Sequence, residues 1–173
     1  CLGEEALIIQ HEPQVVRDRL KIELSKELKG DRALLNRALK AASMAERIVK
    51  EEGADMIITV AASLFHVLSA TASGGEGPRP GAAERIMERV DLAANVQDEI
   101  RSVLASLKEP SNPAENRNLQ VTVDAITLAE LYEKRRHISD PAEARIILED
   151  KLFTAAGRKL ALEAVIAQPV PKA

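Results

Sequence analysis

Apolar residues recur along this chain at the spacing of amphipathic helices. In residues 13–30 the apolar positions from Val15 to Leu28 lie on one side, charges lie elsewhere, and Gly30 predicts the helix end. In residues 31–53 Asp31 is placed to act as an N-cap, and a broad apolar stripe follows it as far as Gly53. The pattern therefore predicts two successive amphipathic helices.

Residues 54–70 differ from these two helices, because they are apolar almost all round. A helix of this composition is typical of the centre of a bundle, where every side is covered. The β-branched stretch "MIITV" at 56–60 leaves a strand as an alternative, although the apolar run is too long for one.

The rest of the chain alternates between polar loops and further helical patterns. Glycine, proline and polar residues predict loops at 71–81 and 109–118. Helices are expected at 82–90, 93–108, 119–136, 140–153 and 154–167. Asp91 is expected to cap the helix after it, and Asp140 with Pro141 is a strong start signal. The first residues of 119–136 could instead be extended.

These elements together predict an all-α fold, a single helical domain of seven or eight helices. We expect residues 1–30 to contribute an N-terminal amphipathic helix packed on a domain of residues 31–167. Residues 168–173 are expected to form a frayed tail.

Composition narrows the class of function. The 173 residues suit one domain, and 46% hydrophobic with 29% charged residues is ordinary for a soluble globular protein. A net charge of −3 gives no sign of a basic groove, and 2% aromatic residues provide few platforms on which bases could stack. We therefore expect no nucleic-acid partner. No apolar run approaches the roughly 20 residues that span a bilayer, so we expect no membrane partner.

Cys1 is the only cysteine, so no internal disulfide can form. It is either the lipid-acceptor cysteine of a processed lipoprotein or an added or truncated start. The lack of a polar tether after it favours the second interpretation. We expect no signal peptide and a cytoplasmic location.

Four stretches follow one another along the chain: "LLNRALKAASMAERIVKEEGAD" (34–55), "IITVAASLFHVLSA" (57–70), "EGPRPGAAERIMERVDLAANVQDEIRSVLASLKEP" (76–110), and "LQVTVDAITLAEL" (119–131) with the later "FTAAGRKLALE" (153–163). In this order they resemble the HD-domain superfamily of metal-dependent phosphohydrolases. The resemblance covers about residues 34 to 163, most of the chain. It implies an HD-like helical fold.

The resemblance also implies where the family's metal ligands would lie. The family holds one or two divalent ions with a histidine, an adjacent His-Asp pair and a distant aspartate, and has an accessory histidine pair. These positions fall in this sequence at Arg37, Phe65, His66, Leu107, Lys108 and Asp124. Two cations would repel a divalent ion, and His66 with Asp124 gives too few ligands for a tight site. We therefore expect a vestigial pocket with no metal, no cofactor and no catalytic residue.

Several of these positions allow more than one interpretation. His66 is either a partly buried histidine bonded to a backbone carbonyl or a carboxylate, or the partner of Asp124 with a raised pKa. That second arrangement would be a structural bond or a weak acid–base pair. Asp124 pairs with Arg37 in our preferred hypothesis, and is otherwise a helix cap or a solvent-facing acid. Lys108 and Arg37 could instead form an anion pocket for a phosphate or nucleotide.

The resemblance and the departures from it lead to competing functions. The first is a catalytically degenerate HD-fold protein that binds an unknown protein partner or a small anionic ligand. The alternative is an HD-type phosphohydrolase with an altered site that depends on a divalent metal such as Mn, Mg or Zn. Many alanines and few aromatic residues also permit close helix packing, so a helical assembly subunit, including a homodimer, is a third option.

Overall fold

The structure, a computed structural model, describes residues 12–69, 79–108, 113–134 and 137–167. Its helical elements are, in chain order, α2 (Pro13–Glu27), α3 (Arg32–Glu52), α4 (Met56–Phe65), η1 (His66–Ser69), α5 (Ala82–Val90), α6 (Ala94–Lys108), η2 (Pro113–Glu115), α7 (Arg117–Glu133), α8 (Pro141–Ile146), the π-helical η3 (Ile147–Lys151) and α9 (Ala155–Ala164). Within these ranges there are eight α-helices and no strand, so the all-α prediction is confirmed.

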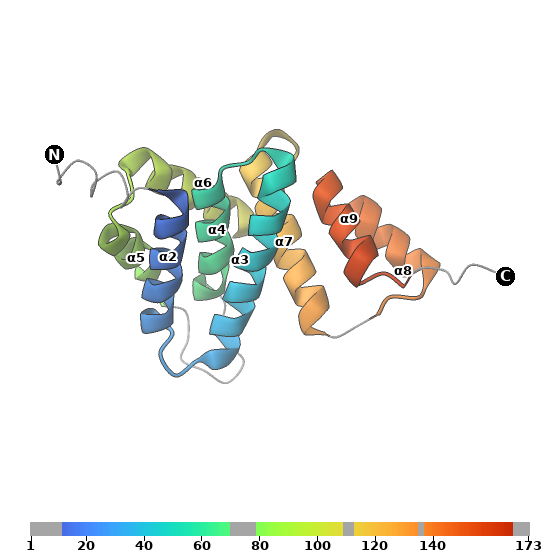
Figure 1. The fold of residues 1–173 in the computed structure, drawn as a ribbon, viewed down its shortest axis with the longest axis horizontal. Coiled ribbons are helices and arrows are strands. Elements are labelled where there is room, and N and C mark those ends of the chain that lie inside the picture. Colours follow the sequence, from blue (N-terminus) through green and yellow to red (C-terminus); the bar gives the residue numbers. More distant parts are fainter. Residues whose placement is uncertain (1–11, 70–78, 109–112, 135–136, 168–173) are drawn as a thin grey trace.

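Helix α4 lies at the centre of the domain (Figure 1). Its residues from Ile58 to Phe65 are all buried, and α2, α3, α6 and α7 pack around it. The helix therefore behaves as its apolar composition predicts, and the strand alternative for residues 56–60 is wrong. Helix α5 packs on α2, and α9 packs on α3 and α7. None of the helices in the described ranges is both long and apolar enough to cross a membrane.

Helix ends follow local signals in most places. The Asp31 carboxylate accepts the Leu34 N–H at the start of α3, and Asp140 accepts the Ala142 N–H at the start of α8. Gly53 ends α3 in the left-handed conformation, with φ of 68°, which costs glycine little. The structure confirms these predicted boundaries. They could be predicted because each depends on residues that are close together in the sequence.

Two predictions about boundaries are wrong. Asp91 does not cap α6, which begins at Ala94; it ends α5 in the left-handed conformation, with φ of 60°. Aspartate tolerates this conformation better than most residues, so one side chain suits either end of a helix. The second polar loop is shorter than predicted, because Asn116 accepts the Leu119 N–H and α7 begins at Arg117. The residues after it are helical and not extended.

The segment after α7 forms one short backbone pairing with the residues that follow α9. Ile138 donates its N–H to the Val165 carbonyl at 3.0 Å, and its own carbonyl accepts the Ala167 N–H at 3.0 Å. Ile138, Val165 and Ile166 are buried there. This pairing closes the α8–α9 unit, which stands beside α7 at one end of the molecule (Figure 1). Cys1 and the expected tail at 168–173 lie outside the described residues.

The packing of α2 can be tested with one buried residue and one exposed control residue on the same helix. Leu24 is 0% exposed and Ile22 is 55% exposed, two positions apart on the same helix. We expect Leu24→Ala to lower the free energy of unfolding by about 2–5 kcal/mol, because it leaves a cavity against the core. Ile22→Ala should change it by less than about 0.5 kcal/mol. Urea unfolding followed by circular dichroism measures both, and equal losses would contradict the assigned register of α2.

Candidate functional site

Asp124 is fully buried on α7 and holds the start of α9. Its Oδ1 accepts the Phe153 N–H at 2.8 Å, and its Oδ2 accepts the Thr154 N–H at 2.8 Å and the Thr154 hydroxyl at 2.6 Å. Burial raises the pKa of Asp124, and the hydrogen bonds from Thr154 and Phe153 oppose that shift. Asp124 therefore binds the N-terminal end of α9. Among the alternatives predicted for Asp124, the helix cap comes closest to this arrangement.

The preferred hypothesis of an Arg37–Asp124 ion pair is wrong. Arg37 instead binds Glu133 through two hydrogen bonds, Nε to Oε2 at 3.0 Å and Nη2 to Oε1 at 3.1 Å. This pairing on Glu133 raises the pKa of Arg37 and lowers the pKa of Glu133. The sequence could not separate the two acids, because both lie on α7 and the choice depends on how α7 is rotated.

His66 is bonded to a backbone carbonyl, which is the first of the two interpretations predicted for it. At the end of α4 its Nδ1 donates to the Ser63 carbonyl at 2.6 Å. Burial lowers the pKa of His66, and the charge of Arg37 lowers it further, while the Ser63 carbonyl and Glu130 act in the opposite direction. The alternative in which Asp124 raises the pKa of His66 is therefore wrong, and the predicted bond to a backbone carbonyl is confirmed.

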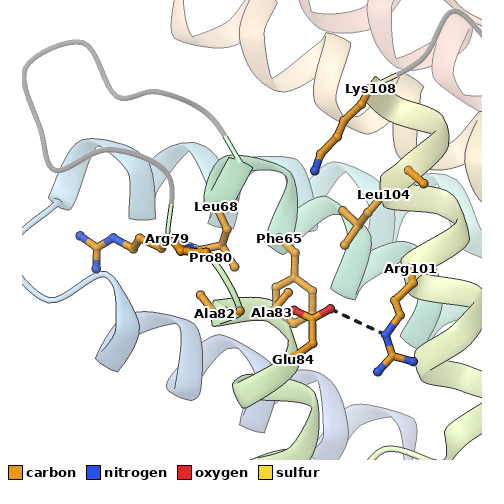
Figure 2. A pocket seen from close by; sticks show the side chains of 12 residues that line it. Phe65, Leu68, Arg79, Pro80, Ala82, Ala83, Glu84, Arg101, Leu104 and Lys108 are labelled. Carbon is orange, nitrogen blue, oxygen red and sulfur yellow. Dashed lines mark ion pairs between the residues drawn. The ribbon is translucent and has the colours of Figure 1, made fainter.

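A cavity of about 630 Å³ lies where η1, the start of α5 and the second half of α6 meet (Figure 2). Its lining residues are Phe65, Leu68, Arg79, Pro80, Gly81, Ala82, Ala83, Glu84, Arg101, Leu104, Ala105 and Lys108. Phe65 is 1% exposed and forms an apolar inner surface together with Leu68 and Leu104. A cavity of this size, mostly apolar with a few polar groups, is typical of small-molecule sites.

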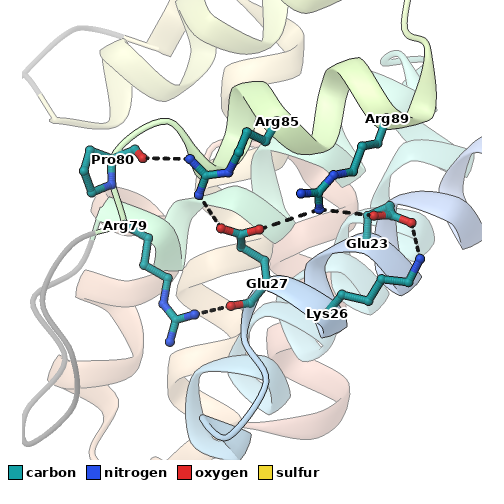
Figure 3. Close-up of polar contacts among 7 residues, drawn as sticks. All are labelled: Glu23, Lys26, Glu27, Arg79, Pro80, Arg85 and Arg89. Atoms are coloured by element: carbon teal, nitrogen blue, oxygen red, sulfur yellow. Dashed lines mark hydrogen bonds and ion pairs between the residues drawn. The ribbon is translucent and has the colours of Figure 1, made fainter.

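The charged groups at this cavity are not equivalent. Arg101 binds Asp98 at 2.7 Å and lies 3.7 Å from Glu84. The Arg79 guanidinium points away from the cavity and donates to the Glu27 carbonyl (Figures 2 and 3). The Lys108 side chain forms no ion pair or hydrogen bond with any residue in the described ranges, and it extends toward Phe65 and Leu104. Lys108 is thus the positive group available to a ligand.

Ion pairs between α2 and α5 hold one wall of the cavity (Figure 3). The Glu27 carboxylate binds Arg85 and lies 3.8 Å from Arg89. Glu23 binds Arg89 at 3.4 Å and Lys26 at 2.5 Å. This network orients α5, whose first residues line the cavity.

A second, smaller hollow of about 200 Å³ adjoins the end of α6. Its lining residues are His66, Leu104, Leu107, Lys108 and Ile126. Three of the six predicted pocket residues, His66, Leu107 and Lys108, therefore lie together at this hollow. Phe65 and Lys108 lie together at the larger cavity. Arg37 and Asp124 line neither space.

Sequence reasoning missed Arg79, Glu84 and Arg101 at the larger cavity. A partial signal existed on α6, because Arg101, Leu104 and Lys108 follow the i, i+3, i+7 spacing of one helix face. No comparable signal placed the start of α5 opposite that face. The approach of the two helices is a property of the packed domain.

The residues present do not fit a metal centre of the HD type. Among the described residues no group of three His, Cys, Asp or Glu side chains is placed to hold an ion. The Asp124 oxygens already accept three hydrogen bonds, and His66 Nδ1 donates to a carbonyl. A divalent ion would therefore have to displace structural bonds in order to use Asp124, and without Asp124 the Nε2 of His66 would offer it only one ligand.

Comparisons of the chain with protein-family models, with curated proteins and with solved structures found no match. The resemblance to HD domains thus depends on the four sequence stretches alone, and the geometry of the cavity is the structural evidence for a function.

Asp124 should be important for stability. Asp124→Ala removes the acceptor of two backbone N–H groups and a hydroxyl at the start of α9, so we expect the free energy of unfolding to fall by about 2–4 kcal/mol. Asp140→Ala, which removes one exposed N-cap at α8, should cost about 1 kcal/mol. Urea unfolding measures the two losses, and hydrogen exchange should speed up at Thr154 in the first variant alone. A loss no larger than that of the control would contradict the role of Asp124.

His66 should make stability depend on pH. Its pKa in the folded chain lies below the ordinary value of about 6.5, so the unfolded chain takes up the proton first as pH falls. The free energy of unfolding should therefore fall with pH from about 6.5 toward the lowered pKa, by at most about 1.4 kcal/mol per pH unit. Asp124 contributes the opposite slope between its ordinary value of 3.8 and its raised pKa, because there the folded chain binds the proton first. Denaturation at several pH values should show the first slope in the native chain and not in His66→Gln.

Proposed function

We propose that this chain acts by binding and not by catalysis, and that it takes a small anionic ligand with an apolar part in the cavity between α4, α5 and α6. The observation that carries the proposal is the combination of a largely apolar lining with Lys108, which has no charged partner within the described ranges. An anionic group placed at Lys108 gains a charge-assisted hydrogen bond, and the remainder of the ligand covers Phe65 and Leu104.

We also propose that the helical frame is a degenerate form of the HD domain. The four sequence stretches support this origin, and the positions that match the family's ligands now serve other purposes. Arg37 binds Glu133, and Asp124 holds α9. Phe65 and Lys108 line the cavity in which we place the ligand. The altered phosphohydrolase has less support, because the described residues do not assemble a divalent-metal site.

The proposal is tested with decanoate, which combines one carboxylate with an apolar chain. Calorimetric titration of the full chain should show saturable binding at one site. Lys108→Met should weaken it about tenfold or more, because a hydrogen bond to a charged group contributes about 1.5–3 kcal/mol. Lys50→Met is the matched control, since Lys50 is exposed on α3 and does not line the cavity. Equal losses in the two variants, or no saturable binding, would contradict the proposal.

Metal dependence gives an independent check. Elemental analysis of the purified chain should show no stoichiometric metal, and added Mn²⁺, Zn²⁺ or Mg²⁺ should leave the melting temperature unchanged. Ligands that bind only the folded state raise the apparent stability, so a large metal-dependent rise would favour the phosphohydrolase alternative.

A further inference from the structure

The α6 face that lines the cavity has a charged residue at each end and apolar residues between them. Arg101, Leu104 and Lys108 all line the cavity. Seven residues of an α-helix span roughly 10 Å, so Arg101 and Lys108 mark two separate ends of the space. Figure 2 shows Leu104 between them and Phe65 beside it.

The two ends carry different charge. At one end Lys108 has no acidic partner among the described residues. At the other end the Arg101 guanidinium binds Asp98 at 2.7 Å and Gln97 at 3.0 Å, and it lies 3.7 Å from the Glu84 carboxylate. Two carboxylates therefore surround one guanidinium, and the Arg101 end has no positive charge to offer a ligand.

Glu84 is the acidic side chain that lines the cavity itself. It projects from the first turn of α5 across to Arg101, as Figure 2 shows. A second carboxylate on a ligand would meet the Glu84 carboxylate at this end, and like charges at short range repel, most strongly at low ionic strength because Glu84 is half-exposed. An apolar chain end would meet no such opposition, because Ala82 and Ala83 lie next to Glu84 in the lining.

We propose that the ligand is an amphipathic monoanion whose head lies at Lys108 and whose apolar tail points toward Glu84 and Arg101. Glu84 determines specificity, since it excludes ligands that carry a second anionic group at the tail. This inference rests on the proposed function, and it names the class of ligand and the residue that selects it.

The test compares decanoate with decanedioate, which has the same chain length and a carboxylate at both ends. Calorimetric titrations use the full native chain, Glu84→Gln and Glu88→Gln. Glu88 is the matched control, because it lies one turn further along α5, is exposed and does not line the cavity. The native chain should bind decanoate about tenfold or more tightly than decanedioate. Glu84→Gln should reduce this preference to about threefold or less, and Glu88→Gln should keep it.

The outcomes separate this inference from the proposed function. Equal affinity for both probes in the native chain, or a preference that Glu84→Gln leaves intact, overturns the role of Glu84 but leaves binding at Lys108 in place. Tighter binding of decanedioate shows that Arg101 recruits the second carboxylate, and it also overturns the inference. Binding of neither probe overturns the proposed function itself.

Discussion

The burial of α4 on all sides from Ile58 to Phe65 is the constraint on which the rest of the domain depends. A helix whose residues 58–65 are all buried has no side that can face water, so other helices must surround it. Helices α2, α3, α6 and α7 do so. The cavity begins where this cover ends, because Phe65 and Leu68 lie at the point where α4 passes into η1. The position of the candidate site is thus a consequence of how the core is closed.

Two carboxylates connect this core to the C-terminal helix pair. Asp124 on α7 accepts hydrogen bonds from Phe153 and Thr154, and Glu52 at the end of α3 accepts the Ala156 N–H at 2.8 Å. The free N–H groups at the start of a helix favour negative charge, so both acids are well placed at α9. This also explains how Asp124 is accommodated in an apolar stretch: a buried carboxylate needs donors, and the start of α9 supplies them.

Structural features that depend on residues close together in the sequence could be predicted. Features that depend on how the helices pack against one another could not. The all-α class, a central helix within 54–70, and the caps at Asp31 and Asp140 are local properties, and the structure confirms them, with α4 at Met56–Phe65. The pairing of Arg37 with Glu133 is not local, because the two residues lie on different helices whose rotation the sequence does not specify. The candidate site is predicted in part for the same reason: Lys108 is identified as one of its residues, but the wall that α5 supplies is not.

The α5 wall of the cavity combines two kinds of interaction with different consequences. Its apolar side chains, Ile86 and Met87 among them, are buried against the core and contribute most of its stability. The ion pairs of Arg85 and Arg89 with Glu27 are half-exposed on the arginine side, so each contributes little and is screened by salt. The buried face therefore fixes where α5 lies, and the ion pairs add weak contacts that align its polar side with α2. The packing of α5 on the core thus places its first turn opposite α6 at the cavity, although neither Ile86 nor Met87 lines that cavity.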